Sequence, residues 1–151
     1  MDINHDLGSI FSDALTEVIS TISSFSVKLL SQEKDNDFED ITGIMSLNGE
    51  KIGTFFVSAK ELDMRLLCSY MIGVHRAEVT KDDIEDIVCE LVNMTAGSVR
   101  LRLAGTDYAF DLSQPYVVKG INMSIVTKKK TRLISRTIGN DEISVKLKVI
   151  Y

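Results

Sequence analysis

Two stretches of the chain repeat apolar residues at the spacing of an α-helix. The first covers residues 7–23, and the second begins near Lys81 and runs through Leu103. Both therefore predict amphipathic helices. At a rise of 1.5 Å per residue the second helix would be about 33 Å long. It is expected to be the longest element of the fold.

Capping sequences predict where two helices begin. Thr80 precedes Asp83 at the start of the long helix, and Ser58 precedes Glu61 at the start of a shorter one. A hydroxyl and a carboxylate at this spacing can satisfy the free N–H groups of a helix N-terminus. The shorter helix is expected to end at Gly73, because glycine readily adopts the left-handed conformation that closes a helix.

Elsewhere the residues alternate in polarity as in β-strands. The dipeptide Asn48-Gly49 separates two such runs and predicts a tight hairpin turn, in which both residues need positive φ. The expected strands cover residues 25–30, 41–47, 51–57, 108–112, 116–119, 121–128, 132–137 and 143–150. This order predicts an α+β fold, a single domain over residues 1–151 with helices layered on an antiparallel-rich sheet.

A weak internal repeat indicates that the domain has two related halves. A short glycine-led motif follows each long helix, at residues 43–46 and 120–124. The two helices also share a pattern of two acidic residues and one polar residue at equal spacing: Asp13, Glu17 and Ser20 in the first, Asp86, Glu90 and Asn93 in the second. Together the matches predict a pseudo-two-fold arrangement.

Composition excludes several classes of protein. Hydrophobic residues make up 44% and charged residues 26% of the 151 residues, which is typical of a globular chain. Apolar runs are too short for a membrane span, and the first residues lack the features of a signal peptide, so a cytoplasmic protein is expected. Two cysteines and two histidines, not clustered as ligands, predict that no metal site is present.

Charge is distributed unevenly along the chain. Residues 1–93 contain 18 acidic and 7 basic side chains, whereas residues 94–151 contain 4 acidic and 10 basic ones. No DNA- or RNA-binding motif surrounds the basic stretch 128–136, so we expect no nucleic-acid partner. A solvated strand edge or turn accounts for these charges, and their purpose is left open.

The long helix has an apolar and a polar face. Its core-type residues spread over about 160°, whereas Asp83, Asp86, Glu90, Asn93 and Gly97 gather within about 80° on the opposite side. Such a face is usually only solvated. Asn93 and Gly97 fit that interpretation poorly, because in a helix interior Asn costs up to about 0.7 and Gly about 1 kcal/mol relative to Ala. They indicate a functional face or, for Gly97, a close helix contact.

The segment from Asp86 to Gly97 resembles the signature of the CheC/CheX/FliY chemotaxis phosphatase family. That signature is an Asp or Ser, then Glu, two residues, Asn, and a proline beyond the helix. Pro115, the only proline of the chain, stands near that place. Segments 40–43, 53–57 and 115–120 are also similar to CheX. The resemblance covers most of residues 8–127 and implies a CheC-like fold, with two long helices and a shorter one on the sheet.

The resemblance implies a phosphatase that hydrolyses the aspartyl phosphate of a CheY-type response regulator. Asn93 would position the attacking water, and Glu90 would dock onto a lysine of the regulator. The partner-binding residues would be Asp83, Asp86, Met94 and Gly97. No cofactor of the chain's own is expected, because Mg²⁺ would be held by the regulator.

The resemblance favours the CheX side of the family. In the first helix Ser20 stands where the amide should be, so that face is expected to be catalytically silent. A homodimer is expected, as in CheX-like proteins. The alternative is a non-catalytic adaptor or flagellar-switch-like module that docks a regulator. Neither the regulator nor the pathway can be identified from the sequence.

Overall fold

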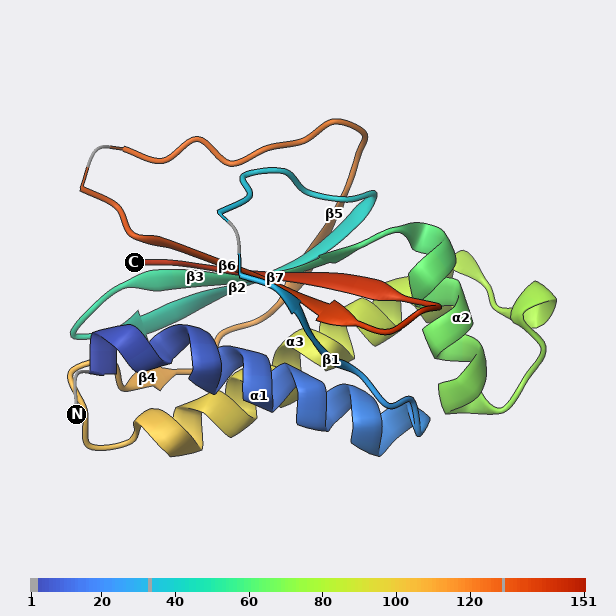
Figure 1. Cartoon of the computed structure of the whole chain (residues 1–151), viewed down its shortest axis with the longest axis horizontal. Helices are drawn as coiled ribbons and strands as arrows, with labels where there is room; N and C mark the ends of the chain where they lie inside the picture. Colours follow the sequence, from blue (N-terminus) through green and yellow to red (C-terminus); the bar gives the residue numbers. More distant parts are fainter. Residues whose placement is uncertain (1–2, 33, 129) are drawn as a thin grey trace.

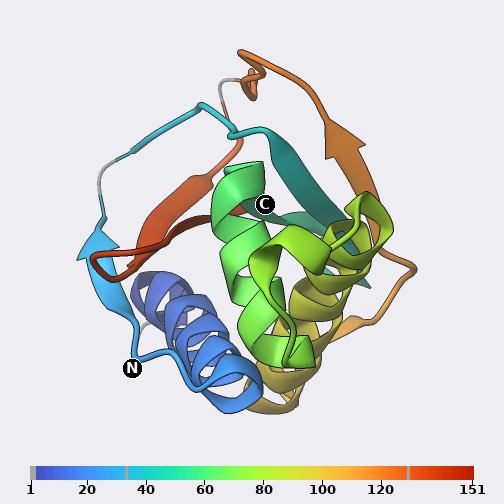
Figure 2. The same cartoon turned by 90° about the vertical axis from the view of Figure 1, so that its right-hand side faces the viewer.

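Helices and long loops cover opposite faces of one sheet. The computed structural model describes residues 3–32, 34–128 and 130–151. In Figure 1 the two long helices, α1 (Ile3–Ser23) and α3 (Lys81–Leu103), lie below the sheet, and the shorter α2 (Glu61–Ile72) packs at one end. Figure 2, seen from that end, shows all three on the same side of the sheet. No helix among the described residues is both long and apolar enough to cross a membrane.

The strand order is symmetric. The strands are β1 (Lys28–Ser31), β2 (Ile41–Gly49), β3 (Gly53–Ala59), β4 (Phe110–Asp111), β5 (Tyr116–Lys119), β6 (Leu133–Gly139) and β7 (Ser144–Ile150). They run β1-β6-β7-β3-β2, with β4 and β5 both pairing β2, and all pairs are antiparallel. Exchanging α1-β1-β2-β3 with α3-β5-β6-β7 leaves the order unchanged. The predicted α+β, pseudo-two-fold fold is confirmed.

The β2–β3 hairpin is present, but its turn is not at Asn48-Gly49. Both residues continue β2 and pair with β4, and residues 50–52 make the connection to β3. The predicted turn is therefore wrong, and neither residue has positive φ. A Cβ on Gly49 would lie 2.0 Å from the carbonyl oxygen of Ala109. Glycine is needed here because β4 approaches closely.

The predicted start of α3 and end of α2 are confirmed. The Thr80 hydroxyl accepts the Asp83 N–H at 3.1 Å, and the Asp83 carboxylate accepts the Thr80 N–H at 2.9 Å. Gly73 ends α2 with a φ of 70°. A short 3₁₀ turn, η1 (Arg76–Glu78), which the sequence did not predict, connects the two helices.

The predicted cap of α2 is wrong. Ser58 lies in β3, where its hydroxyl accepts the Glu39 N–H at 2.8 Å. The N-terminus of α2 is instead satisfied from the loop before β2, because the Asp40 carboxylate accepts the Glu61 N–H at 3.1 Å. A tertiary contact has replaced the local one.

Three predicted strands are shorter than expected or absent. The first strand begins at Lys28 rather than Phe25, and β4 has only two residues. Residues 121–128 form no strand, and Ser124 makes an isolated bridge there. Asn122 has a φ of 56°, and a left-handed residue interrupts an extended run. The glycine-led motif at 43–46 lies in strand β2, whereas the matching motif at 120–124 forms no strand. That part of the predicted repeat is therefore wrong.

The helix α3 is held against the sheet from one side and against α1 from the other. A Cβ on Gly43 of β2 would lie 2.7 Å from Val92 and 2.8 Å from Val88, so the helix rests on the sheet at this glycine. Phe11 of α1 packs on Phe55 of β3 with ring centroids 5.1 Å apart. The packing leaves one face of α3 outward.

On the opposite face of the sheet a buried lysine ties down a loop. Lys148 is fully buried and donates hydrogen bonds to the Asp35 carbonyl and, at 3.1 Å, to the Ser135 hydroxyl. Lys146 pairs with the Asp35 carboxylate at 2.7 Å. Burial lowers the pKa of Lys148. These interactions hold the segment around Asp35, which lies before β2 and above the sheet in Figure 1, against strand β7.

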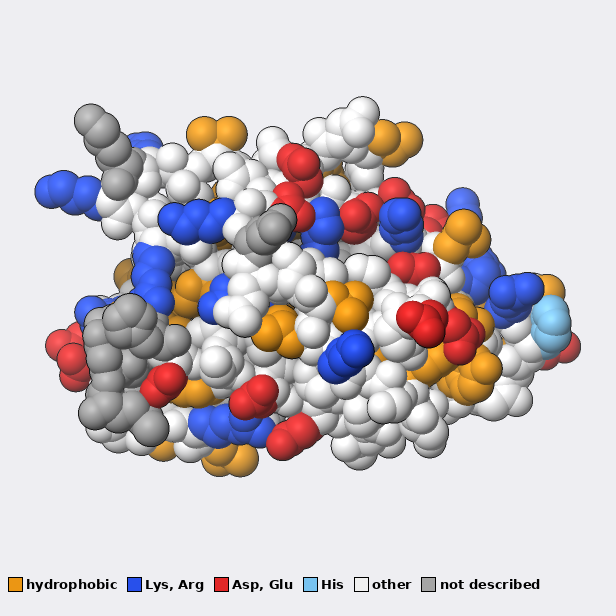
Figure 3. Space-filling view, in the orientation of Figure 1, with side chains coloured by type: hydrophobic (Ala, Val, Ile, Leu, Met, Phe, Trp, Pro, Cys, Tyr) orange, Lys and Arg blue, Asp and Glu red, His pale blue; other side chains and the backbone are white. Residues whose placement is uncertain are grey.

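The basic stretch 128–136 does not form one exposed patch. Arg136 is half-buried against α1, where a Cβ on Gly8 would lie 2.2 Å from its guanidinium. Burial lowers the pKa of Arg136. Lys129 lies outside the described residues. Figure 3 shows several basic side chains at the upper left of this view, and acidic and basic side chains interspersed over the rest of it.

Candidate functional site

The outward face of α3 presents Glu90 and Asn93 to solvent. Both side chains are exposed, as is Asp86 one turn earlier, whereas Leu91 and Val92 are fully buried. Residues three apart lie on the same side of a helix, so the carboxylate and the amide face outward together. The placement agrees with the expected geometry, and the chemical roles of the two residues stay predictions.

Gly97 follows Asn93 by about one turn of the same face. A Cβ built on Gly97 would meet no atom of the described residues within 4 Å. The alternative that this glycine marks a close helix contact within the chain is therefore wrong. A glycine inside a helix lowers stability relative to alanine, and no contact of the half-buried Gly97 with the described residues requires it. The open space above it is available to another molecule.

The remaining predicted partner-binding residues differ in their exposure and in their contacts within the chain. Asp86 is exposed, whereas Asp83 uses its carboxylate to cap α3. The hydrogen bonds from the backbone and side chain of Thr80 lower the pKa of Asp83, which keeps the carboxylate ionised. Met94 is half-buried and packs on the core beside the outward face. Asp83 and Met94 thus have structural roles within the chain as well.

Neither thiol is suited to nucleophilic chemistry. Cys68 is buried and Cys89 is half-buried on α3, and both are free. Burial, with the negative charge of Asp86 and Glu85, raises the pKa of Cys89. Burial likewise raises the pKa of Cys68. Because the thiolate is the reactive form, the outward face of α3 offers carboxylate and amide chemistry instead.

The matching face of α1 is also exposed, but Glu17, the residue that corresponds to Glu90, forms an ion pair within the chain. Asp13, Glu17 and Ser20 all face solvent. The Glu17 carboxylate pairs with the guanidinium of Arg102, from α3, at 2.7 Å. Sequence reasoning missed this ion pair, because 85 residues separate its members. The α1 face thus lacks the amide, and the acid that corresponds to Glu90 is already paired within the chain.

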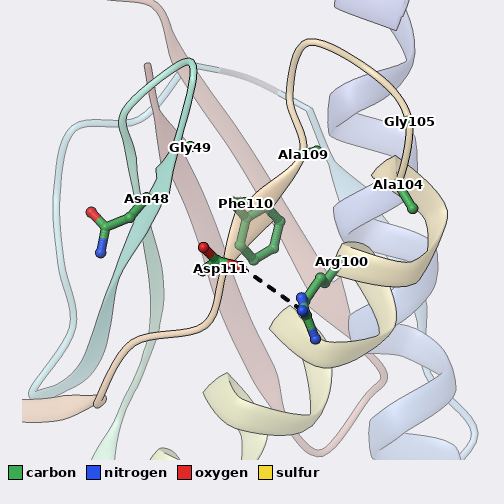
Figure 4. Close-up of a pocket in the computed structure, with 8 residues that line it drawn as sticks. All are labelled: Asn48, Gly49, Arg100, Ala104, Gly105, Ala109, Phe110 and Asp111. Atoms are coloured by element: carbon green, nitrogen blue, oxygen red, sulfur yellow. Dashed lines mark ion pairs between the residues drawn. The ribbon is translucent and has the colours of Figure 1, made fainter.

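Arg100 continues the outward face of α3 and was not predicted as a site residue. Beside it lies a hollow of about 360 Å³, lined by Asn48, Gly49, Arg100, Ala104, Gly105, Ala109, Phe110 and Asp111. Figure 4 shows Arg100 and Asp111 pointing toward each other from α3 and β4. The only signal for it in the sequence was its spacing of seven residues from Asn93, which places both on one side of the helix.

Comparison with known proteins shows where this fold occurs. A CheC-like superfamily protein from Shewanella sp. PV-4 is 24% identical, with a TM-score of 0.82 over 99% of this chain and 98% of that one. CheX from Vibrio vulnificus is 22% identical, with a TM-score of 0.80 over 93% of each chain. A CheX–CheY–BeF3–Mg²⁺ complex from Borrelia burgdorferi contains a chain 17% identical, with a TM-score of 0.77 over 94% of this chain and 96% of that one.

A comparison with protein-family models identifies the sequence itself. No curated protein matches this chain. The family described as "Chemotaxis phosphatase CheX" matches residues 41–138. The match runs from the start of β2 into β6 and includes the whole of α3 with its outward face. The chain therefore belongs to the CheX family of chemotaxis phosphatases.

Proposed function

We propose that this protein hydrolyses the aspartyl phosphate of a CheY-type response regulator, with α3 as the element that meets the partner's active site. The family description supports this activity. A structure of similar fold contains CheX together with CheY, BeF3 and Mg²⁺. The observation that carries the proposal is the outward placement of Glu90 and Asn93 on the same side of α3.

Asn93 orients the attacking water. The regulator already holds the phosphoryl group and Mg²⁺, so the phosphatase needs chiefly to place a water in line with the bond that breaks. A side-chain amide can both donate to and accept from a water. Because it is neutral, it brings no negative charge toward the phosphoryl oxygens. The exposed Asn93 side chain can reach beyond the helix surface for this purpose.

Glu90 docks the helix onto the partner. Its exposed carboxylate lies one turn before Asn93 and can pair with a lysine of the regulator through a charge-assisted hydrogen bond. An ion pair on one side of Asn93 fixes the distance between the amide and the phosphoryl group. The cap of Thr80 and the contact at Gly43 hold α3 rigidly, and such support keeps a site in its productive geometry.

Phosphate release tests the proposal directly. The purified protein is mixed, in less than stoichiometric amount, with a phosphorylated CheY-type regulator of the same cell and Mg²⁺. We expect multiple turnovers and a release rate well above the regulator's own hydrolysis. Binding of the regulator with no acceleration would instead identify a non-catalytic adaptor and overturn the proposed activity.

Gly97→Ala is expected to change stability and docking in opposite directions. The new methyl group meets open space, so unfolding should cost about 1 kcal/mol more, the difference in helix propensity between Gly and Ala. If the regulator's backbone approaches Gly97 closely, the same methyl should weaken binding by about tenfold, or about 1.4 kcal/mol. Thermal denaturation and titration with the regulator measure the two effects. Wild-type affinity would remove Gly97 from the docking surface.

Ser20→Ala is expected to leave turnover within about twofold of wild type, because a surface change without partners costs little. The α1 face offers no amide, and Glu17, which corresponds to Glu90, is paired with Arg102. Phosphate release under saturating regulator is the measurement. A large loss of activity would show that α1 carries a second site.

We propose in addition that two copies associate through an open sheet edge. Among the described residues β5 pairs only with β2, and unpaired strand edges readily pair with another chain. Tyr116 of β5 and Ile121 just beyond it are exposed, at 55% and 84%. Light scattering of the protein in solution measures this state, and a monomer at micromolar concentration would contradict it.

A further inference from the structure

The outward face of α3 carries charges of both signs. Asp83, Asp86 and Glu90 precede Asn93 on this face, and Arg100 follows it. Arg100 lies seven residues after Asn93, so the two side chains lie nearly in line, about 10.5 Å apart along the helix axis. The face is therefore acidic on the N-terminal side of the amide and basic on the C-terminal side.

Arg100 is held only loosely within the chain. Its guanidinium pairs with the Asp111 carboxylate at 3.9 Å, and the two side chains are 51% and 86% exposed. Arg102, two residues later, pairs with Glu17 at 2.7 Å. An exposed ion pair as long as that of Arg100 contributes little to stability. In the described part of the chain no hydrogen bond engages the Arg100 guanidinium, whose N–H groups can therefore bind a carboxylate from outside.

The chain also leaves room beside Arg100. Gly105, with a φ of 78°, lets the chain leave the end of α3 and return toward β4. The hollow between them measures about 360 Å³, whereas a water occupies about 30 Å³ in the liquid. A side chain of a partner fits there. In Figure 4 the side chains of Asp111 and Arg100 point toward each other among the residues that line this hollow.

We infer that Arg100 is a second docking residue, which binds an acidic side chain on the surface of the regulator and releases Asp111 as it does so. The inference rests on the proposed function and adds a partner group to it. Arg100 lies ten residues beyond Glu90, so the regulator's acidic group lies about 15 Å along the helix axis from the lysine that Glu90 contacts. Opposite charges at two points fix the direction of the helix in the complex.

A purely structural role for Arg100 predicts a different result. A cation in the last turn of a helix interacts favourably with the helix dipole, and this effect would appear in stability alone. Binding is therefore measured by titration with a regulator loaded with Mg²⁺ and BeF3, and turnover is measured separately at saturating phosphorylated regulator. Arg100→Gln is compared with Arg100→Lys, which keeps the charge, and with Lys28→Gln, which removes a charge from the far edge of the sheet.

We expect Arg100→Gln to raise the Kd about tenfold and to leave saturated turnover near wild type. Arg100→Lys should recover most of the affinity, and Lys28→Gln should bind normally. Asp111→Asn should tighten binding about twofold, because it removes the competing carboxylate. Wild-type affinity of Arg100→Gln, or a tenfold loss in Asp111→Asn, would overturn the inference. If Arg100→Gln weakens binding but the wild-type protein releases no phosphate, the docking role stands and the proposed catalysis fails.

Discussion

Asn93→Ala is expected to slow dephosphorylation of the regulator at least about 100-fold, equivalent to about 2.7 kcal/mol of activation free energy. The amide is exposed, so its removal leaves no cavity and no unpaired buried group. A residue that orients water acts mainly in the transition state, and its loss should lower turnover without weakening binding. Single-turnover phosphate release at saturating protein measures the chemical step, and titration with the BeF3-loaded regulator measures binding.

Two further variants isolate the role of the neutral amide. Asn93→Asp keeps the size of the side chain and adds a negative charge, so it should be at least as slow as the alanine variant. Asp13→Ala removes an exposed side chain from the matching face of α1 and should be normal. If Asn93→Ala retained wild-type turnover on a regulator that the protein demonstrably dephosphorylates, the proposed mechanism would be wrong.

The helix that carries the site could be predicted because its signals are local. Its apolar period extends over 23 residues, and its cap is a reciprocal pair three residues apart, Thr80 and Asp83. Helical geometry alone then sets which residues point outward. The outward placement of Glu90 and Asn93 followed from this geometry, and only the resemblance to a family suggested what they do.

The errors lie where a distant segment decides the local structure. Asn48-Gly49 has the composition of a tight turn, but β4 pairs there and extends β2 through both residues. Ser58 has the spacing of a cap, but its hydroxyl accepts the Glu39 N–H, and Asp40 caps the helix instead. In each case an interaction with a distant segment outweighs the local preference, which for a helix cap is about 1 kcal/mol.

The candidate site was incomplete for the same reason. The ion pair between Glu17 and Arg102 joins α1 to α3 across most of the chain, and no periodicity reveals it. Arg100 had the right spacing, but its significance depends on the hollow beside β4. The chain turns back toward β4 at Gly105, which has positive φ and is one of the residues that line this hollow. Periodicity assigns faces to a helix, whereas the neighbours of each face come from the fold.

Glu90→Ala is expected to weaken docking and activity together, by about 30-fold in both Kd and kcat/KM, or about 2 kcal/mol of binding free energy. An exposed acid that pairs with a partner's lysine becomes desolvated only in the complex, so its loss should be felt in binding. The substitution leaves the fold intact, because the carboxylate is exposed and makes no ion pair among the described residues. Thermal denaturation should therefore show little change.

A double-mutant cycle tests whether Glu90 acts on the regulator's lysine. Glu90→Gln in this protein is combined with replacement of that lysine by methionine in the regulator, and Kd values are measured with the BeF3-loaded form where it still assembles. If the two groups pair in the complex, the second substitution should cost far less in the presence of the first, with a coupling of at least about 1 kcal/mol. In the complex both groups would be partly buried at the regulator's active site, and salt screens a buried ion pair less than an exposed one. The coupling measured in 0.3 M salt should therefore stay close to its value at low salt. Additive effects of the two substitutions would place Glu90 away from the lysine, and unchanged affinity of Glu90→Gln would remove it from the docking surface.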